Sequence, residues 1–170
     1  LIDTICSSVE EYWDTYNQIV FDQDNPSVNL HHPTFGPDEV MAMVKVMLST
    51  RVTMGPKVLE FESEISEYFG VSEAITNNSG SSANLLAIAA LANPATPNSL
   101  KPGDEVIVPA LSWSTTVWPL IQHNLVPVFV DVDPDTLNID PQSIKAAITD
   151  KTKALMIVPV YGNPCDMDSI

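Results

Sequence analysis

The sequence predicts an α/β protein with a mainly parallel sheet and helices on both faces. From Glu73 onwards, short apolar runs alternate with helical stretches, which is the order that a parallel sheet requires. The apolar runs are continuous instead of alternating with polar residues, as expected for strands covered on both faces. Candidate strands span residues 74–76, 105–108, 126–132 and 154–160. Candidate helices span residues 82–92, 113–123 and 141–149, the last with Asp140 or its neighbour as its N-cap.

Further helices precede this alternation. Apolar residues recur at helical spacing from Ile2 to Val20 and predict an amphipathic first helix. Residues 21–36 form an extended linker, whose pair His31-His32 is expected to be structural or exposed, with a metal role as the less favoured alternative. A second helix starts at Pro37, and a third follows Gly55-Pro56 and stops at Gly70. We therefore divide the chain into residues 1–36 and a domain of residues 37–170.

Composition restricts the function classes. The chain has 170 residues, 45% of them apolar, which suits one domain of ordinary size. Neither a membrane span nor a signal peptide is indicated, so a cytoplasmic location is expected. Cys6 and Cys165 lack the spacing of a zinc site or a disulfide framework and are expected to be reduced thiols. The 22 acidic and 7 basic residues give a net charge of −15, which argues against binding of nucleic-acid polymers.

One turn carries the main chemical signal. Residues 77–84 read Asn-Asn-Ser-Gly-Ser-Ser-Ala-Asn and connect a strand-like run to a helix. A Gly/Ser turn that opens a helix presents unpaired N–H groups and the positive end of the helix dipole, which bind phosphate or another anion. The alternative is an ordinary turn whose serines only cap the helix.

Three turns are expected to converge at the carboxyl ends of the strands, where such sheets bind ligands. They are residues 79–81, 109–113 and 161–164. Trp113 lies in the second turn, where it could stack on a planar ring or simply pack. No GxGxxG and no Walker A sequence is present, so a phosphate here is not held in either of those ways.

Six short motifs, in order, resemble the DegT/DnrJ/EryC1/StrS family. The resemblance runs from about Phe35 to Ile170. Its motifs are Gly55-Pro56 with Phe61-Glu62, Asn78 to Asn84, Lys101 to Val106, Ser112 to Thr116, Pro127 to Asp133, and Gly162-Asn163-Pro164 with Asp166-Met167-Asp168.

The resemblance implies the incomplete large domain of the type I pyridoxal-phosphate fold, with pyridoxal 5′-phosphate as cofactor. It assigns Gly80, Ser81 and Ser82 to the cofactor phosphate and Trp113 to stacking against the pyridine ring. It makes Gly55 and Asn163 candidates for the substrate site or the partner subunit's site. It implies a homodimer, no metal, and a Schiff-base lysine and a ring-nitrogen aspartate beyond Ile170, so that no catalytic residue lies in this chain.

Three functions are open, two of them within the family that the chain resembles. We favour a sugar aminotransferase that transfers an amino group from a donor such as glutamate to a nucleotide-linked keto sugar, in cell-surface polysaccharide or deoxyaminosugar biosynthesis. The first alternative is a pyridoxamine-phosphate-dependent sugar 3-dehydratase, suggested by the 93–100 insertion and the Gly162-Asn163-Pro164 turn. The second alternative is a non-catalytic binding or assembly module. Four strands and a start at Leu1 also lead us to expect a piece of a longer protein with exposed sheet edges.

Overall fold

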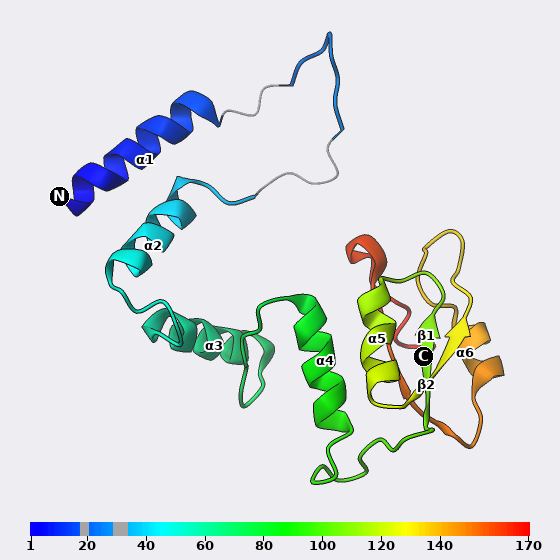
Figure 1. The fold of residues 1–170 in the computed structure, drawn as a ribbon. Coiled ribbons are helices and arrows are strands. Elements are labelled where there is room, and N and C mark those ends of the chain that lie inside the picture. The colour runs from blue at the N-terminus through cyan, green and yellow to red at the C-terminus, as the bar shows by residue number, and fades with distance from the viewer. Residues whose placement is uncertain (18–20, 29–33) are drawn as a thin grey trace. The chain divides into compact units, whose positions relative to one another are not determined.

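The computed structural model describes residues 1–17, 21–28 and 34–170 (Figure 1). These residues form two compact units, Leu1–Thr76 and Asn77–Ile170. The predicted division after residue 36 stays a prediction, and the His31-His32 pair lies outside the described residues. Among the described residues, no helix combines the length and the apolar composition that a membrane crossing demands.

The first unit contains three helices, α1 (Ile2–Tyr16), α2 (Pro37–Leu48) and α3 (Pro56–Phe69). Helices α2 and α3 each begin at a proline, whose fixed φ suits the first helical position. The Glu39 side chain accepts a hydrogen bond from the Gly36 N–H and so caps the start of α2. Helix α3 ends at Gly70 in the left-handed conformation, with φ 65°, which confirms the predicted stop.

The predicted strand at residues 74–76 is wrong, because the structure leaves this segment as an extended connection. Both the N–H and the hydroxyl of Thr76 donate to the Glu62 carboxylate, at 2.8 and 2.9 Å. A side chain therefore occupies a backbone donor that a strand would give to its neighbour. None of the strands described in this chain pairs with the segment.

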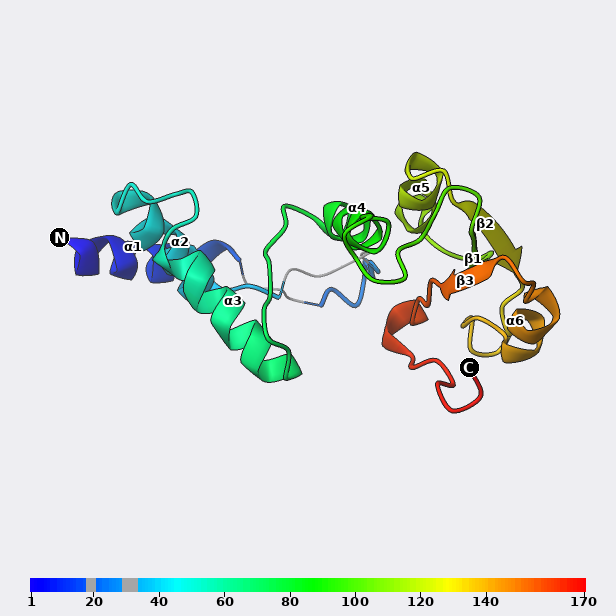
Figure 2. The same ribbon diagram turned by 90° about the horizontal axis from the view of Figure 1, so that it is seen from below.

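The second unit is built on a three-stranded parallel sheet with the order β2-β1-β3 (Figures 1 and 2). The strands are β1 (Glu105–Pro109), β2 (Val126–Val130) and β3 (Thr152–Leu155). The helices are α4 (Gly80–Leu91), α5 (Ser114–Gln122) and α6 (Pro141–Ala147), and a 3₁₀ turn, η1 (Val160–Gly162), follows β3. The Asp140 carboxylate accepts from the N–H groups of Gln142 and Ser143, which confirms it as the N-cap of α6.

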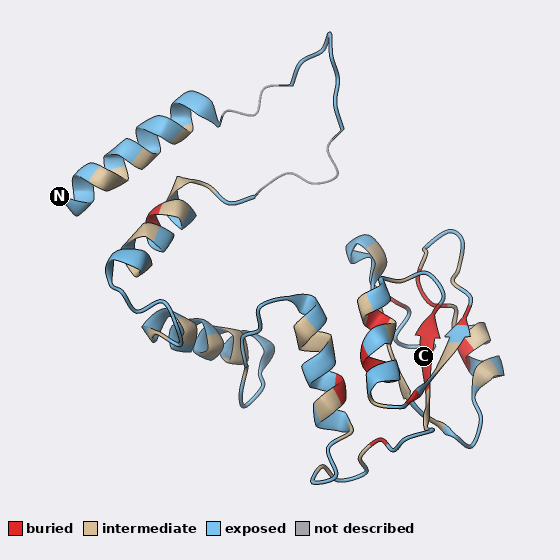
Figure 3. Cartoon of the chain, viewed as in Figure 1, coloured by how far each residue is buried: buried red, intermediate tan, exposed pale blue. Residues whose placement is uncertain are grey.

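Strand β1 is the centre of the core and is almost entirely buried (Figure 3). Its two faces pack into two apolar clusters. Val106 and Val108 join Ile88 of α4 and Leu120 of α5. Between them, Ile107 points to the opposite face, because successive side chains of a strand alternate. There it meets a cluster of Val130, Ile139 and Ile144. The predicted α/β class, with helices on both faces of a parallel sheet, is confirmed.

Two strands differ from their predicted bounds for identifiable reasons. Strand β3 was predicted at residues 154–160, but it starts opposite Glu105 at Thr152. Its pairing with β1 ends with the bond from the Met156 N–H to the Ile107 carbonyl. Strand β2 ends at Val130, two residues earlier than predicted, because Val132 pairs in antiparallel fashion with Ile139 instead.

Candidate functional site

The first turn of α4 contains the three residues predicted to hold a phosphate. Helix α4 begins at Gly80, two residues earlier than the predicted start, so Gly80, Ser81 and Ser82 are helical. Ser79 is the N-cap, and its hydroxyl accepts from the Ser82 N–H at 3.2 Å. N–H groups in a first helical turn have no carbonyl partner within their own helix. The turn therefore offers donors to an anion, which would compete with Ser79 for the Ser82 N–H.

Gly80 has no local reason to be a glycine. A Cβ at this position would meet no heavy atom of the described residues within 4 Å, and the backbone has no positive φ. Glycine is otherwise a costly choice within a helix. A remaining physical reason is the close approach of a ligand or of another part of the protein to the backbone.

Trp113 is the N-cap residue of α5 and is 76% exposed. An exposed indole contributes little to the core of this unit, so its packing within the described residues does not explain it. The predicted stacking role stays a prediction, for which the ring is accessible.

Helices α4 and α5 begin at the same end of the unit, the end toward which β1 and β2 point (Figure 1). The two helices pack against each other, and the Asn84 side-chain amide donates to the Thr115 carbonyl at 3.4 Å. A surface pocket of about 280 Å³ lies between the start of α4 and the side of α5 along its length. Its lining residues are Ser81, Ser82, Leu85, Thr115, Trp118, Pro119 and Gln122. Two of the predicted phosphate residues, Ser81 and Ser82, thus share a pocket with α5, whereas Gly80 and Trp113 do not line it.

The third predicted turn is held by a buried asparagine that sequence reasoning missed. Asn138 is 4% exposed and accepts from the Val160 N–H at 3.0 Å. Its amide donates to the carbonyls of Asn163 and Pro164, at 3.1 and 3.0 Å. A single polar residue between Leu137 and Ile139 was the available signal. The side chain of Asn163 itself donates to the Thr136 carbonyl at 3.3 Å, and its substrate role stays a prediction.

The loop that carries Asn138 is shaped by two carboxylates. Hydrogen bonds from the N–H and hydroxyl of Thr136 lower the pKa of Asp133. A hydrogen bond from the Ser143 hydroxyl, followed by one from the Gln142 N–H, lowers the pKa of Asp140. Both groups are held as hydrogen-bond acceptors for the loop between β2 and α6.

Gly55, the other candidate for a substrate or partner site, is the N-cap of α3 in the first unit. Here a Cβ would lie 2.7 Å from the Arg51 carbonyl oxygen, so close backbone packing explains this glycine. Its predicted approach to an active site stays a prediction.

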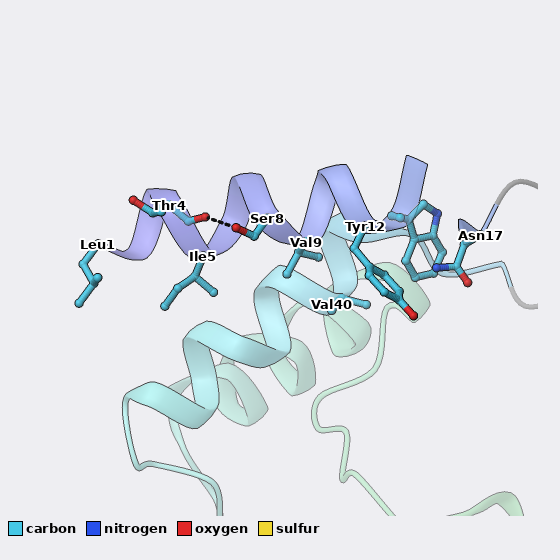
Figure 4. A pocket seen from close by; sticks show the side chains of 9 residues that line it. Leu1, Thr4, Ile5, Ser8, Val9, Tyr12, Asn17 and Val40 are labelled. Atoms are coloured by element: carbon cyan, nitrogen blue, oxygen red, sulfur yellow. Dashed lines mark hydrogen bonds between the residues drawn. The ribbon is translucent and has the colours of Figure 1, made fainter. Parts of the chain in front are cut away.

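A second pocket, of about 440 Å³, lies between α1 and α2 (Figure 4). It is lined by Leu1, Thr4, Ile5, Ser8, Val9, Tyr12, Trp13, Asn17 and Val40. The Ser8 hydroxyl is engaged with the Thr4 carbonyl at 3.0 Å. None of these lining residues has a cationic side chain, so this pocket is poorly suited to a phosphate.

Comparison with known proteins identifies the family. A model described as the DegT/DnrJ/EryC1/StrS aminotransferase family matches residues 33–170. The chain belongs to this family. The resemblance inferred from the six motifs is therefore confirmed.

Two curated relatives are sugar dehydratases. GDP-4-keto-6-deoxy-D-mannose 3-dehydratase of Yersinia pseudotuberculosis is 49% identical over 137 residues, which cover 81% of this chain and 35% of that protein. dTDP-4-dehydro-2,6-dideoxy-D-glucose 3-dehydratase of Saccharopolyspora spinosa is 40% identical over 169 residues, which cover 99% of this chain and 37% of that protein. The chain thus spans about a third of the length of these relatives.

Two solved structures share the fold of this DegT/DnrJ/EryC1/StrS chain. The E. coli GDP-4-keto-6-deoxy-D-mannose-3-dehydratase with bound hydrated PLP has a TM-score of 0.79 and 46% identity, and covers 84% of this chain and 36% of its own. A putative sugar aminotransferase of Streptococcus pneumoniae in its PMP form has a TM-score of 0.73 and 31% identity. The match covers 84% of this chain and 34% of the aminotransferase chain. The neighbours have the type I pyridoxal-phosphate fold, so this chain has part of that fold.

Proposed function

We propose that this chain supplies the phosphate-binding half of a pyridoxal-phosphate site, in an enzyme that acts on a nucleotide-linked keto sugar. The observation that carries the proposal is the placement of Gly80, Ser81 and Ser82 at the start of α4, beside the start of α5. In this arrangement the N-termini of two helices lie at one edge of a parallel sheet, where the helix dipoles favour a dianionic phosphate.

The residues of the turn fit the cofactor's phosphate. Ser81 and Ser82 supply backbone N–H groups and hydroxyls, and Gly80 leaves room for an anion to reach the backbone. Ser79 holds the turn in its helical conformation through its bond to Ser82. When bound, pyridoxal phosphate would supply an electron sink that stabilises negative charge at a reacting carbon. The role of this chain is to bind and orient it.

Trp113 supplies the second contact in the proposal. Its exposed indole offers a flat face to the pyridine ring, and its place at the start of α5 keeps that face near the edge where α4 begins. The phosphate would then fix one end of the cofactor and the indole would fix the plane of its ring. Such orientation lowers the barrier of a reaction by removing unproductive geometries.

Within the family, we propose the 3-dehydratase branch first. Its support is the identity of 40–49% to the dehydratase relatives and structure, against 31–36% to the neighbouring aminotransferase structures. The S. spinosa dehydratase also aligns with 99% of the chain, including the α1 region that the family model leaves out. The sugar aminotransferase, favoured by the sequence alone, stays the second candidate because a neighbour of that description shares the fold.

Cofactor binding tests the proposal. Titration of the whole protein with pyridoxal phosphate should produce a visible circular-dichroism band, which inorganic phosphate weakens by competition. Trp113→Ala should raise the cofactor Kd about three- to tenfold by removing the stacking contact. Its far-UV spectrum should stay unchanged, because the side chain lies outside the core. An unchanged Kd would contradict the stacking role, and the lack of any band from the unmodified protein would contradict the proposal.

An isotope experiment separates the two branches. The whole protein is incubated with GDP-4-keto-6-deoxymannose, pyridoxal phosphate and ¹⁵N-glutamate, and the sugar product is analysed by mass spectrometry. A dehydratase should remove the C3 oxygen and leave no ¹⁵N in the sugar. An aminotransferase should place ¹⁵N in the sugar and keep the C3 oxygen. The second result would overturn the dehydratase assignment.

A further inference from the structure

Asn84 joins the first turns of α4 and α5 through a hydrogen bond that depends on a proline. In an α-helix, the carbonyl of one residue accepts from the N–H four residues later. For Thr115 that later residue is Pro119, which lies inside α5 and has no N–H to give. The Asn84 amide of the neighbouring helix donates to the Thr115 carbonyl instead, at 3.4 Å. The proline thus creates the acceptor that ties the two helices together.

The position of this bond matters for the proposed cofactor site. Asn84 lies one helical turn after Gly80, and Thr115 lies two residues after Trp113. Asn84 and Thr115 are both half-buried, and Pro119 is buried. From Ala83 to Leu91, all residues of α4 except Asn84 are apolar. Asn84 is therefore an isolated polar group in this part of the helix. Its bond connects the phosphate-binding turn to the helix that begins next to the stacking residue.

We infer that Asn84 and Pro119 are a pair of positioning residues, which hold the phosphate-binding turn of α4 at a fixed separation from Trp113. The inference rests on the proposed function. The phosphate and the ring of pyridoxal phosphate are a fixed short span apart, so a cradle and a stacking face on two different helices must keep a constant separation. Functional groups need such support from side chains that do not touch the ligand themselves.

Cofactor titration of Asn84 variants of the whole protein tests the inference. Asn84→Ala should raise the Kd for pyridoxal phosphate about fivefold, since one net hydrogen bond is lost. It should also weaken the circular-dichroism band of the bound cofactor at saturation, because the ring is no longer held in one orientation. Asn84→Asp keeps the size of the side chain but cannot donate when ionised, and should have at least as large an effect. Asn93→Ala makes the same change beyond the other end of α4, where Asn93 is exposed, and should leave both readouts unchanged.

The role of the proline is tested by a double-mutant cycle. Pro119→Ala gives α5 back the N–H that the Thr115 carbonyl lacks. In the parent background, Asn84→Ala should lower the Tm by about 2–4 °C, because the carbonyl loses its donor. In the Pro119→Ala background, the same substitution should lower it by less than half as much.

Each outcome decides one point. If the unmodified protein binds the cofactor and Asn84→Ala leaves both the Kd and the band unchanged, the positioning role is overturned and the proposed function stands. Equal Tm losses in the two backgrounds would overturn the pairing with Pro119. If the unmodified protein does not bind the cofactor, the proposed function fails, and the positioning role fails with it.

Discussion

The two candidate-site glycines, Gly55 and Gly80, are glycines for different physical reasons. Gly55 is required by its own surroundings, since a Cβ there would lie 2.7 Å from the Arg51 carbonyl oxygen. Gly80 faces open space among the described residues and has no positive φ. The first glycine is therefore explained by folding, and the second is explained by something that approaches from outside the described chain.

The two glycines should respond in opposite ways to the same substitution. Gly55→Ala should reduce the free energy of unfolding by about 1–3 kcal/mol, because the new methyl group collides with backbone. Gly80→Ala should change it by about 0.5 kcal/mol or less, yet weaken binding of pyridoxal phosphate by blocking the approach to the backbone. Urea denaturation and cofactor titration of both variants measure the contrast. Undiminished cofactor binding by Gly80→Ala would show that no phosphate reaches this backbone.

At the scale of elements, the buried Asn138 connects the loop after β2 to the turn after β3. It satisfies three backbone groups, the N–H of Val160 and the carbonyls of Asn163 and Pro164. This explains how the turn at residues 160–164, which contains Tyr161 at φ 53° and Gly162 at φ 79°, is held in an irregular conformation. Buried backbone groups that lose their partners are costly, so the connection should be important for stability.

Asn138→Leu should therefore lower the free energy of unfolding of the whole protein by about 2–4 kcal/mol, since no new side-chain donor or acceptor replaces the amide. Urea denaturation followed by circular dichroism measures the loss. The matched control is Asn163→Ala, which removes an exposed amide from the same turn and should cost about 0.5 kcal/mol or less. Similar losses from the two variants would contradict the role given to Asn138.

The sequence predicted those elements whose signals are local. Pro37, Gly70 and Asp140 mark helix ends by their own conformational or capping preferences, and each lies at the end predicted for it. The prediction of a strand at 74–76 was wrong because the Thr76 N–H donates to the Glu62 carboxylate, which lies 14 residues away and which no local pattern reveals. For the site, Ser81 and Ser82 were visible as a helix-opening turn. The proposed positioning role of Asn84 was not visible, because it depends on a hydrogen bond to the Thr115 carbonyl, 31 residues away.

At the scale of the whole chain, carboxylates are the dominant charged groups and also part of the fold. The formal charge is −15, and hydrogen bonds to Asp22, Glu39, Glu62, Asp133 and Asp140 lower the pKa of each. For Glu39 and Glu62 the largest cause is a backbone N–H, that of Gly36 and of Thr76 respectively. These carboxylates lie in both compact units, so acid should affect the helical unit and the α/β unit together.

The direction of the pH effect follows from the lowered pKa values. A carboxyl group whose pKa is lower in the folded state binds fewer protons there than in the unfolded state, so its stabilising contribution is complete above its unfolded pKa. That contribution is lost as the pH falls through the folded pKa. We therefore expect the free energy of unfolding to decrease as the pH is lowered below about 4–4.5, the ordinary range of these groups.

A helix cap that does not titrate separates the contribution of the Asp140 carboxylate from the general loss of negative charge in acid. Asp140→Asn keeps an oxygen acceptor for the start of α6, so the variant should be nearly as stable as the parent at low pH, when Asp140 is protonated. Any advantage of the parent should be present at pH 7 and shrink as the pH falls through the lowered pKa of Asp140. Urea denaturation of both proteins from pH 3 to pH 7 gives the difference between their free energies of unfolding. The effect of the other charged groups is nearly the same in both proteins and cancels in that difference. A difference that grows on acidification would mean that the Asp140 carboxylate does not stabilise the fold through its hydrogen bonds.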